Sequence, residues 1–244
     1  MISTHSSVST FSHLGDRPQF DAENKPAQAV TYWLTRDIVR GVFPPGKRLK
    51  VAELSDFYKV GYSPVRDAIH AQAFYELVSH EHFRGYAVAP VSLTDYDEVL
   101  QAFQQIYKLA AKMALEQGGN DWEESLIVEL HRSKKVVKVM PDADPELREY
   151  WQRAYWSFHY KILEGCGSKT LLNFFTQLAN RLERYVSLYA DMESDRTREN
   201  HAEHESLIKA IVDRDENEFM FQIDSYFSRS NTIRESIKQS LKQL

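Results

Sequence analysis

The sequence predicts a mainly α-helical protein, in which an N-terminal winged helix-turn-helix precedes a C-terminal antiparallel all-helical bundle. Between residues 25 and 91, three segments with helical spacing of apolar residues are followed by two short β segments. From residue 95 onward, amphipathic helical patterns follow one another through short connections, and we find no strand pattern. The order of these elements predicts the two parts.

Composition and charge divide the chain in a similar way. The 244 residues are 43% apolar and 27% charged, which suits two modest domains with buried cores. Residues 1–92 carry ten Lys and Arg against nine Asp and Glu, whereas the remainder carries twenty against twenty-six. We therefore expect the two parts to have different partners. The predicted boundaries are a disordered arm over 1–24, the winged helix-turn-helix over 25–91 and the helical domain over 92–244.

The single cysteine, Cys166, permits no disulfide within the chain and no cysteine-based zinc site. The N-terminal residues lack an apolar run followed by a cleavage site, and no stretch of about 18 apolar residues occurs. These features predict a protein of the reducing cytoplasm without a membrane partner.

The first helix is predicted to begin at Pro26, a favourable first-turn residue, and to end at Gly41. The Pro-Pro-Gly of residues 44–46 then forms a turn, because this sequence cannot continue a helix. A short second helix is predicted over residues 52–58.

The third helix follows a tight turn over residues 59–62. We expect Ser63 to be its N-cap and Pro64 to occupy its first position, and the helix to run to about Tyr75. In a helix-turn-helix, the helix after the turn enters the major groove of DNA. This helix is therefore the predicted DNA-recognition element.

The wing and the helical domain complete the predicted fold. Two short β segments, over residues 77–79 and 86–88, are joined by a hairpin tip over residues 82–85. Six helices are then predicted, over residues 95–117, 122–139, 145–165, 168–191, 195–214 and 216–244.

Basic and polar side chains gather at the turns and element starts of the winged helix-turn-helix. Operator binding needs cations placed for phosphates and polar groups that reach base edges. Arg66 in the third helix and Arg84 at the hairpin tip have the placement expected for DNA contact. For the lysines, a solvated surface position is the alternative. The candidate DNA-binding residues are Lys47, Arg48, Tyr62, Ser63, Arg66, Arg84 and Gly85, with Lys50 nearby.

Several of these positions belong to longer motifs. These motifs are Ile38-Val39-Arg40-Gly41, Pro45-Gly46-Lys47-Arg48-Leu49, Pro64-Val65-Arg66-Asp67-Ala68-Ile69, Leu77-Val78 and Arg84-Gly85. Through them, residues 38–85 resemble the GntR superfamily of bacterial transcription regulators. The resemblance implies a winged helix-turn-helix that binds operator DNA.

Two departures from the family pattern fall near the third helix. Gly61 and Tyr62 occupy the places of a Ser-Arg pair, so one phosphate or guanine contact expected in the family is lost. Tyr75 and Glu76 stand where the family usually has Glu-Gly. These differences imply an operator that differs from the family's common one.

A second set of matching residues lies in the helical part. It comprises Phe158-His159, Glu203-His204, Ile208, Ala210-Ile211 and Asp215. Through them the helical part resembles the FadR-type branch of the superfamily, whose all-helical effector domain is called FCD. Gly118-Gly119 with Trp122-Glu123, and Gly165-Cys166-Gly167-Ser168, are similar to the carbon-starvation-induced regulator group, which handles short dicarboxylate metabolism.

Many members of this branch bind a divalent metal such as Zn or Ni through one Asp and three His. On that pattern Tyr155 takes the Asp position, His159 and His204 are retained, and Tyr226 takes the third His position. Two imidazoles alone hold a divalent ion weakly, because such sites usually supply three or four protein ligands. We therefore expect no cofactor. The alternative is a residual metal site of His159, His204 and, from the same helix face, His201.

Aromatic residues also replace two other polar positions of the family's pocket. The first helix of an FCD domain usually carries an Arg and, four residues on, a Glu; the resemblance places Phe103 and Tyr107 there. We expect a metal-free, partly aromatic cavity for a small organic acid or an aromatic metabolite. The alternative is that the aromatics fill the core and no ligand binds. The candidate effector-binding residues are Phe103, Tyr107, Tyr155, His159, His204 and Tyr226.

Together these features predict a metabolite-responsive regulator, acting as a repressor, that binds a palindromic operator as a homodimer. Effector binding would shift helix packing and change the spacing of the two recognition helices. No nucleophile elbow or phosphate loop occurs, and we expect no enzyme activity. Two alternatives stay open, a metal-dependent enzyme built on the helical bundle and a regulator that has no effector.

Overall fold

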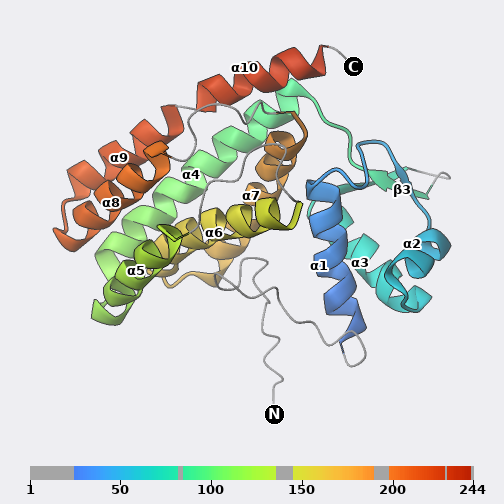
Figure 1. The fold of residues 1–244 in the computed structure, drawn as a ribbon, viewed down its shortest axis with the longest axis horizontal. Coiled ribbons are helices and arrows are strands. Elements are labelled where there is room, and N and C mark those ends of the chain that lie inside the picture. Colours follow the sequence, from blue (N-terminus) through green and yellow to red (C-terminus); the bar gives the residue numbers. More distant parts are fainter. Residues whose placement is uncertain (1–24, 82–84, 136–144, 190–197, 229, 243–244) are drawn as a thin grey trace. The chain divides into compact units, whose positions relative to one another are not determined.

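A computed structural model of the chain describes residues 25–81, 85–135, 145–189, 198–228 and 230–242 (Figure 1). The predicted disordered arm, residues 1–24, and residues 82–84 of the predicted hairpin tip lie outside the described residues.

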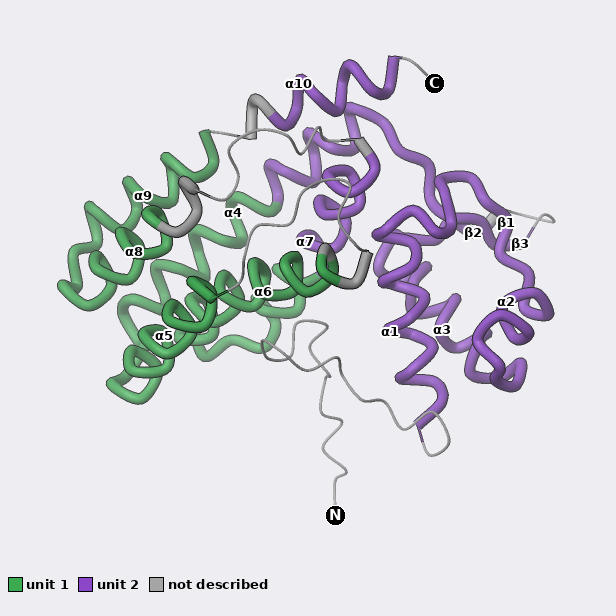
Figure 2. Tube along the Cα trace, in the orientation of Figure 1, with its two compact units in different colours: residues 1–18, 103–176, 191–230 green, residues 19–102, 177–190, 231–244 purple. Residues whose placement is uncertain are grey.

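The described residues form two compact units, each assembled from segments that are distant in sequence (Figure 2). Unit 1 takes its described residues from Phe103–Thr176 and Asp191–Ser230. Unit 2 takes them from Gln19–Ala102, Gln177–Ala190 and Asn231–Leu244. The predicted domains over 25–91 and 92–244 are instead continuous in sequence, and their boundaries stay a prediction.

Within unit 2, the described residues of 26–88 form three helices and a three-stranded antiparallel sheet in the order of a winged helix-turn-helix. The elements are α1 (Pro26–Val39), β1 (Arg48–Leu49), α2 (Val51–Tyr58), α3 (Tyr62–Phe74), β2 (Val78–Glu81) and β3 (Gly85–Val88). The central strand is β3, which pairs with β1 on one side and β2 on the other. Strand β1 was missing from the prediction, because two residues are too few to show a periodic pattern.

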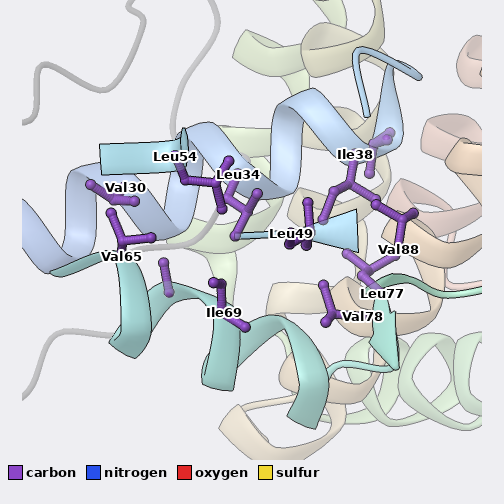
Figure 3. Packing of buried hydrophobic residues seen from close by; sticks show 12 residues of the cluster. Val30, Leu34, Ile38, Leu49, Leu54, Val65, Ile69, Leu77, Val78 and Val88 are labelled. Carbon is purple, nitrogen blue, oxygen red and sulfur yellow. The ribbon is translucent and has the colours of Figure 1, made fainter. Parts of the chain in front are cut away.

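The apolar core of this winged helix-turn-helix lies between α1, α3 and the sheet (Figure 3). Its side chains recur at helical spacing along α1, as at Val30, Leu34 and Ile38, all of which are fully buried. The other core residues are Val39, Leu49, Leu54, Val65, Ala68, Ile69, Leu77, Val78 and Val88. Burying one face of α3 in this core leaves its opposite face free for other contacts.

The turn between α2 and α3 corrects the predicted start of α3. Lys59 adopts the left-handed conformation with φ 57°, and Gly61, not Ser63, is the N-cap residue. Ser63 and Pro64 therefore lie inside the first turn. Proline is tolerated there because the first N–H groups of a helix have no intrahelical partner.

The remaining helices lie close to the predicted ranges, except that α5 ends at Ser133, before the predicted end at residue 139. They are α4 (Leu93–Gln117), α5 (Asn120–Ser133), α6 (Pro145–Glu164), α7 (Lys169–Tyr189), α8 (Arg198–Val212), α9 (Glu216–Ser228) and α10 (Ser230–Leu241). The chain segments of α4 and α7 each belong partly to unit 1 and partly to unit 2. Within the described residues, none of the helices combines the length and the apolar character needed to cross a membrane.

The predicted single helix over residues 216–244 is described as two segments, α9 and α10, on either side of residue 229, which lies outside the described residues. At the end of α9, the hydroxyl of Ser228 donates to the carbonyl oxygen of Ser225 at 2.7 Å.

In unit 1, α5 packs against α6 and α8, and α8 packs against α9. The indole of Trp122 fixes part of this packing, because its Nε1 donates to the carbonyl oxygen of Lys161 at 3.0 Å. A Cβ atom at Gly118 or Gly165 would lie 2.1 or 2.5 Å from the Trp122 ring. The glycine motifs noted in the sequence therefore make room for this tryptophan.

Candidate functional site

The recognition helix α3 exposes one polar face. Val65, Ala68 and Ile69 are buried, whereas Ser63 and Arg66 are exposed and the Tyr62 side chain is 55% exposed. This alternation follows from helical geometry, since residues three and four apart share a face. The predicted DNA-contacting residues of α3 therefore lie on its outward side.

The other candidate DNA-binding residues lie at the base of the wing. Lys47 is tied to β3, because its carbonyl oxygen accepts a hydrogen bond from the Val88 N–H at 2.9 Å. Arg48 pairs with Ala87 across the sheet, and both basic side chains are exposed. Gly85 is exposed and begins β3 with φ 82°, a conformation that favours glycine. Arg84 lies outside the described residues.

The six candidate effector residues come together inside unit 1. We call Phe103, Tyr107, Tyr155, His159, His204 and Tyr226 the tyrosine–histidine cluster. The phenol oxygen of Tyr107 lies 2.8 Å from Nδ1 of His159, and the hydroxyls of Tyr155 and Tyr226 hydrogen-bond to each other. The rings of His159 and His204 have their centroids 5.4 Å apart. Helices α4, α6, α8 and α9 all contribute to this cluster.

Apolar rings surround the cluster, and one of them, Phe158, is among the residues that carry the resemblance to the FCD branch. The Phe103 ring contacts those of Trp156, Phe175 and Phe227, with centroids 5.9, 5.5 and 6.0 Å away. The imidazole of His204 stacks on Phe158 at 3.7 Å. The rings of Trp156, Phe175 and Phe227 were missed because a large apolar residue at helical spacing is typical of any bundle core.

Burial sets the protonation of the central phenol. It raises the pKa of Tyr107 well above its ordinary value, and the nearby Tyr226 hydroxyl acts in the same direction. Tyr107 is therefore a neutral hydrogen-bonding group near neutral pH. A neutral phenol can bind a carboxylate, an amide or another hydroxyl, but it is a poor ligand for a cation.

The cluster does not fit the metal set of one Asp and three His that the resemblance implies. Tyr155 and Tyr226 stand at two of the four ligand positions, and their hydroxyls bond to each other. Among the described residues, no three His, Cys, Asp or Glu side chains are grouped as a metal site. His201 belongs to α8, but its side chain lies outside the described set. Hydrogen bonds between phenols thus occur where the family has metal ligands.

A second group of polar contacts lies in unit 2 and was not predicted. It joins the C-terminal half of α7 to the segment 89–92 that follows the wing, and we call it the α7 clasp. Arg184 is buried, and its guanidinium donates to the carbonyl oxygens of Ala89 and Pro90 at 3.3 and 3.2 Å. Burial lowers the pKa of this guanidinium, whereas Tyr185 and Asp95 act to raise it.

Two more α7 side chains complete the clasp. The Tyr185 hydroxyl accepts from the Ser92 N–H at 3.1 Å and donates to the Asp95 carboxylate at 2.6 Å. Arg181 forms ion pairs with Asp95 and with Glu76, the residue two positions after α3. A sequence pattern cannot reveal such a group, because its members are about ninety residues apart.

These observations define a winged-helix DNA-binding protein with a helical regulatory part. The family of bacterial regulatory proteins called gntR matches residues 26–88, and the FCD domain family matches residues 98–220. The chain therefore belongs to the GntR family of bacterial transcription regulators and carries an FCD domain. This confirms the family and the mainly α fold class expected from the sequence.

Two curated relatives support the same family assignment. "HTH-type transcriptional repressor GlaR" of Escherichia coli (strain K12) is 27% identical over 186 residues, which cover 75% of this chain and 84% of that protein. The uncharacterized HTH-type transcriptional regulator BphR of Paraburkholderia xenovorans (strain LB400) is 27% identical over 208 residues, covering 82% and 84%. These relatives are named as regulators, not as enzymes, so the alternative of a metal-dependent enzyme is set aside.

Solved structures have the same fold. McbR/YncC of E. coli aligns with a TM-score of 0.70 at 17% identity and covers 86% of this chain and 96% of that chain. A GntR transcriptional regulator from Rhodococcus sp. RHA1 aligns with a TM-score of 0.64 at 16% identity, covering 88% and 99%.

Proposed function

We propose that this transcription regulator is a metabolite-responsive repressor. In this proposal it binds a palindromic operator as a homodimer, and a small organic acid or an aromatic metabolite bound at the tyrosine–histidine cluster releases it. The observation on which the proposal rests is the grouping of phenol and imidazole groups inside unit 1. The relative GlaR is named a repressor, which supports the direction of control. Its place of action would be the cytoplasm, where operator DNA lies.

The DNA-contacting residues we propose are those on the exposed face of α3 and at the wing base. Arg66 is the residue expected to reach a guanine edge or a phosphate, because it is a cation on the outward side of the recognition helix. Lys47 and Arg48 are expected to contact phosphates, which fixes the position of the helix in the groove. The remaining proposed contacts are Tyr62, Ser63, Arg84 and Gly85.

The proposed ligand chemistry follows from the groups in the cluster. Neutral phenols and imidazoles bind carboxylates and hydroxyls through hydrogen bonds, and the surrounding rings of Trp156 and Phe175 favour an apolar or aromatic body. A ligand carboxylate would take hydrogen bonds from Tyr155 and Tyr226 in exchange for the bond that these two residues make to each other.

The α7 clasp supports a route for the response. Helix α7 carries Phe175, which contacts the cluster, and two turns further on it carries Arg181 and Arg184 of the clasp. Helix α4 likewise carries both Tyr107 and Asp95. A ligand that displaces either helix would therefore alter contacts with the segment that follows the wing, and so the spacing of the two recognition helices.

A gel-shift release experiment tests this proposal. DNA that spans the gene's own upstream region is first retarded by the protein, and short organic acids and aromatic acids are then added. We expect one class to release the DNA, and we expect Tyr155→Phe to weaken that release while Tyr150→Phe, also on α6, does not. Equal release of DNA by the wild-type protein and by both variants would contradict the assigned site.

The second candidate is a regulator without an effector, and the paired hydroxyls of Tyr155 and Tyr226 favour it. These hydroxyls satisfy each other, so the cluster is also consistent with a filled core. It predicts that none of the acids releases DNA and none raises the melting temperature. Metal analysis of protein purified without chelator tests the expectation that no metal is bound. Analytical ultracentrifugation tests the proposed dimer.

A further inference from the structure

Two histidines of the winged helix-turn-helix contact the same tyrosine ring. His70 lies in α3 and His80 in β2, and both imidazoles are exposed. Their ring centroids lie 5.6 and 4.7 Å from that of Tyr86 in β3. His80 and Tyr86 are also directly opposite each other in the register of β2 and β3.

The sheet register places this group at the edge of the domain core. Val78 and Val88 are paired and buried, and His80 and Tyr86 are the next pair on the same sheet face. That face of the sheet is therefore apolar at Val78 and Val88, which lie in the core, and polar at His80 and Tyr86, which lie at its edge. His70 reaches the same point from α3, one helical turn beyond Arg66 on the exposed side.

This position has a consequence for DNA binding. The recognition helix of a helix-turn-helix lies in the major groove, and a phosphate strand separates that groove from the neighbouring minor groove. The DNA phosphate backbone must therefore pass beside the surface between α3 and the wing. His70, Tyr86 and His80 occupy that surface.

We propose that His70 and His80 contact the DNA backbone and that their protonation strengthens DNA binding. Histidine is the side chain whose charge ordinarily changes between about pH 5 and 8, and each imidazolium adds a phosphate-binding cation. Such an added cation changes the charge of this part of the chain appreciably, because residues 1–92 carry only one more basic than acidic residue.

The charged and titratable neighbours of the two histidines come from α3 and the sheet. On α3, Asp67 precedes His70 by three residues and Arg66 precedes it by four, so both share its side of the helix. On β3 the facing group is the Tyr86 phenol. Arg48 of β1 pairs with Ala87, so it belongs to the opposite face of the sheet.

The test is a DNA-binding titration with a mixed-sequence duplex, followed by fluorescence anisotropy at about pH 6 and about pH 8. A mixed sequence suffices because phosphate contacts do not depend on sequence. We expect the wild-type protein to bind tighter at the lower pH, by at most about tenfold per histidine for each pH unit. The slope of log K against log salt should steepen by up to about two.

Three variants make the test decisive. His70→Gln with His80→Gln should lose both the pH effect and the steeper salt slope, whereas His131→Gln, an exposed histidine of α5, should keep them. His70→Arg with His80→Arg supplies permanent cations, so it should bind at about pH 8 as the wild type does at about pH 6. Thermal melting checks that each variant is folded.

Two results would overturn the inference. One is a glutamine double variant that keeps the wild-type pH and salt dependence. The other is an arginine double variant that binds no tighter than the wild type at the higher pH. The duplex carries no operator, and the titration needs no effector. Both results can therefore be interpreted even if the proposed effector response fails.

Discussion

The phenol oxygen of Tyr107 lies 2.8 Å from Nδ1 of His159, in a hydrogen bond that is buried between α4 and α6. Each group is the other's partner, and both residues are about 1% exposed. Removing one of them therefore leaves a buried polar atom without this bond, which costs more than the bond itself contributes.

Tyr107→Phe should destabilise the protein by about 1–3 kcal/mol, since the ring stays and the hydroxyl goes. For a chain of this size, that corresponds to a fall in melting temperature of roughly 2–4 °C per kcal/mol. Tyr62→Phe, at an exposed position of α3, is the control and should melt like the wild type. Unchanged melting of Tyr107→Phe would show that the bond does not stabilise the fold.

The raised pKa of Tyr107 makes stability depend on pH in the alkaline range. The unfolded chain releases this phenol proton near pH 10, and the folded chain retains it to higher pH because of burial. The contribution is therefore fully present below about pH 10 and is lost as the pH rises above it, at no more than about 1.4 kcal/mol per pH unit. Urea unfolding at several alkaline pH values should show a shallower decline for Tyr107→Phe; equal declines would contradict the assignment.

Glu76 occupies a backbone conformation that ordinarily belongs to glycine. Its φ is 59°, and its carboxylate forms an ion pair with Arg181. The left-handed conformation costs a non-glycine residue roughly 1–2 kcal/mol, whereas an exposed ion pair contributes about 0.2–1 kcal/mol. Both Glu76→Gly and Glu76→Ala lose the pair, but only glycine relieves the backbone.

We therefore expect Glu76→Gly to be more stable than Glu76→Ala by about 1 kcal/mol, and close to the wild type. Chemical denaturation of the three proteins measures this difference. An alanine variant at least as stable as the glycine variant would be inconsistent with a strained Glu76.

Arg184 holds the segment 89–92 through two carbonyl oxygens in the interior of unit 2. Arg184→Met keeps much of the apolar stem and removes both donors, so we expect a loss of about 1–3 kcal/mol and faster amide exchange in that segment. Lys161→Met, on α6, is a control with a similar change of charge at a partly exposed position. If Arg184→Met leaves amide exchange in segment 89–92 unchanged, the α7 clasp has no part in the proposed response.

The sequence predicted the elements better than their contacts. Apolar spacing located α1 and the core residues Val30 and Leu34, because periodicity depends on neighbours along the chain. It did not predict β1. The residues of β1 were too few to form a pattern.

For the candidate site too, the sequence predicted the residues better than their contacts. The resemblance to the FCD branch picked out Tyr107, Tyr155, His159 and Tyr226, and the structure brings all four together in unit 1. It did not pick out Arg184, whose partners are backbone carbonyls that any sequence would supply. It also did not link His70 with His80, because that relation depends on the register of two strands and the path of α3.

The most direct test of the account is a titration of the purified protein against its own upstream region and an unrelated duplex, at one fixed salt concentration. Binding to the upstream DNA in the nanomolar range, at least about 10³-fold tighter than to the unrelated duplex and weakened by Arg66→Ala, is the predicted result. Equal, weak and salt-sensitive binding to both duplexes would contradict the claim that the winged helix-turn-helix of this chain recognises an operator.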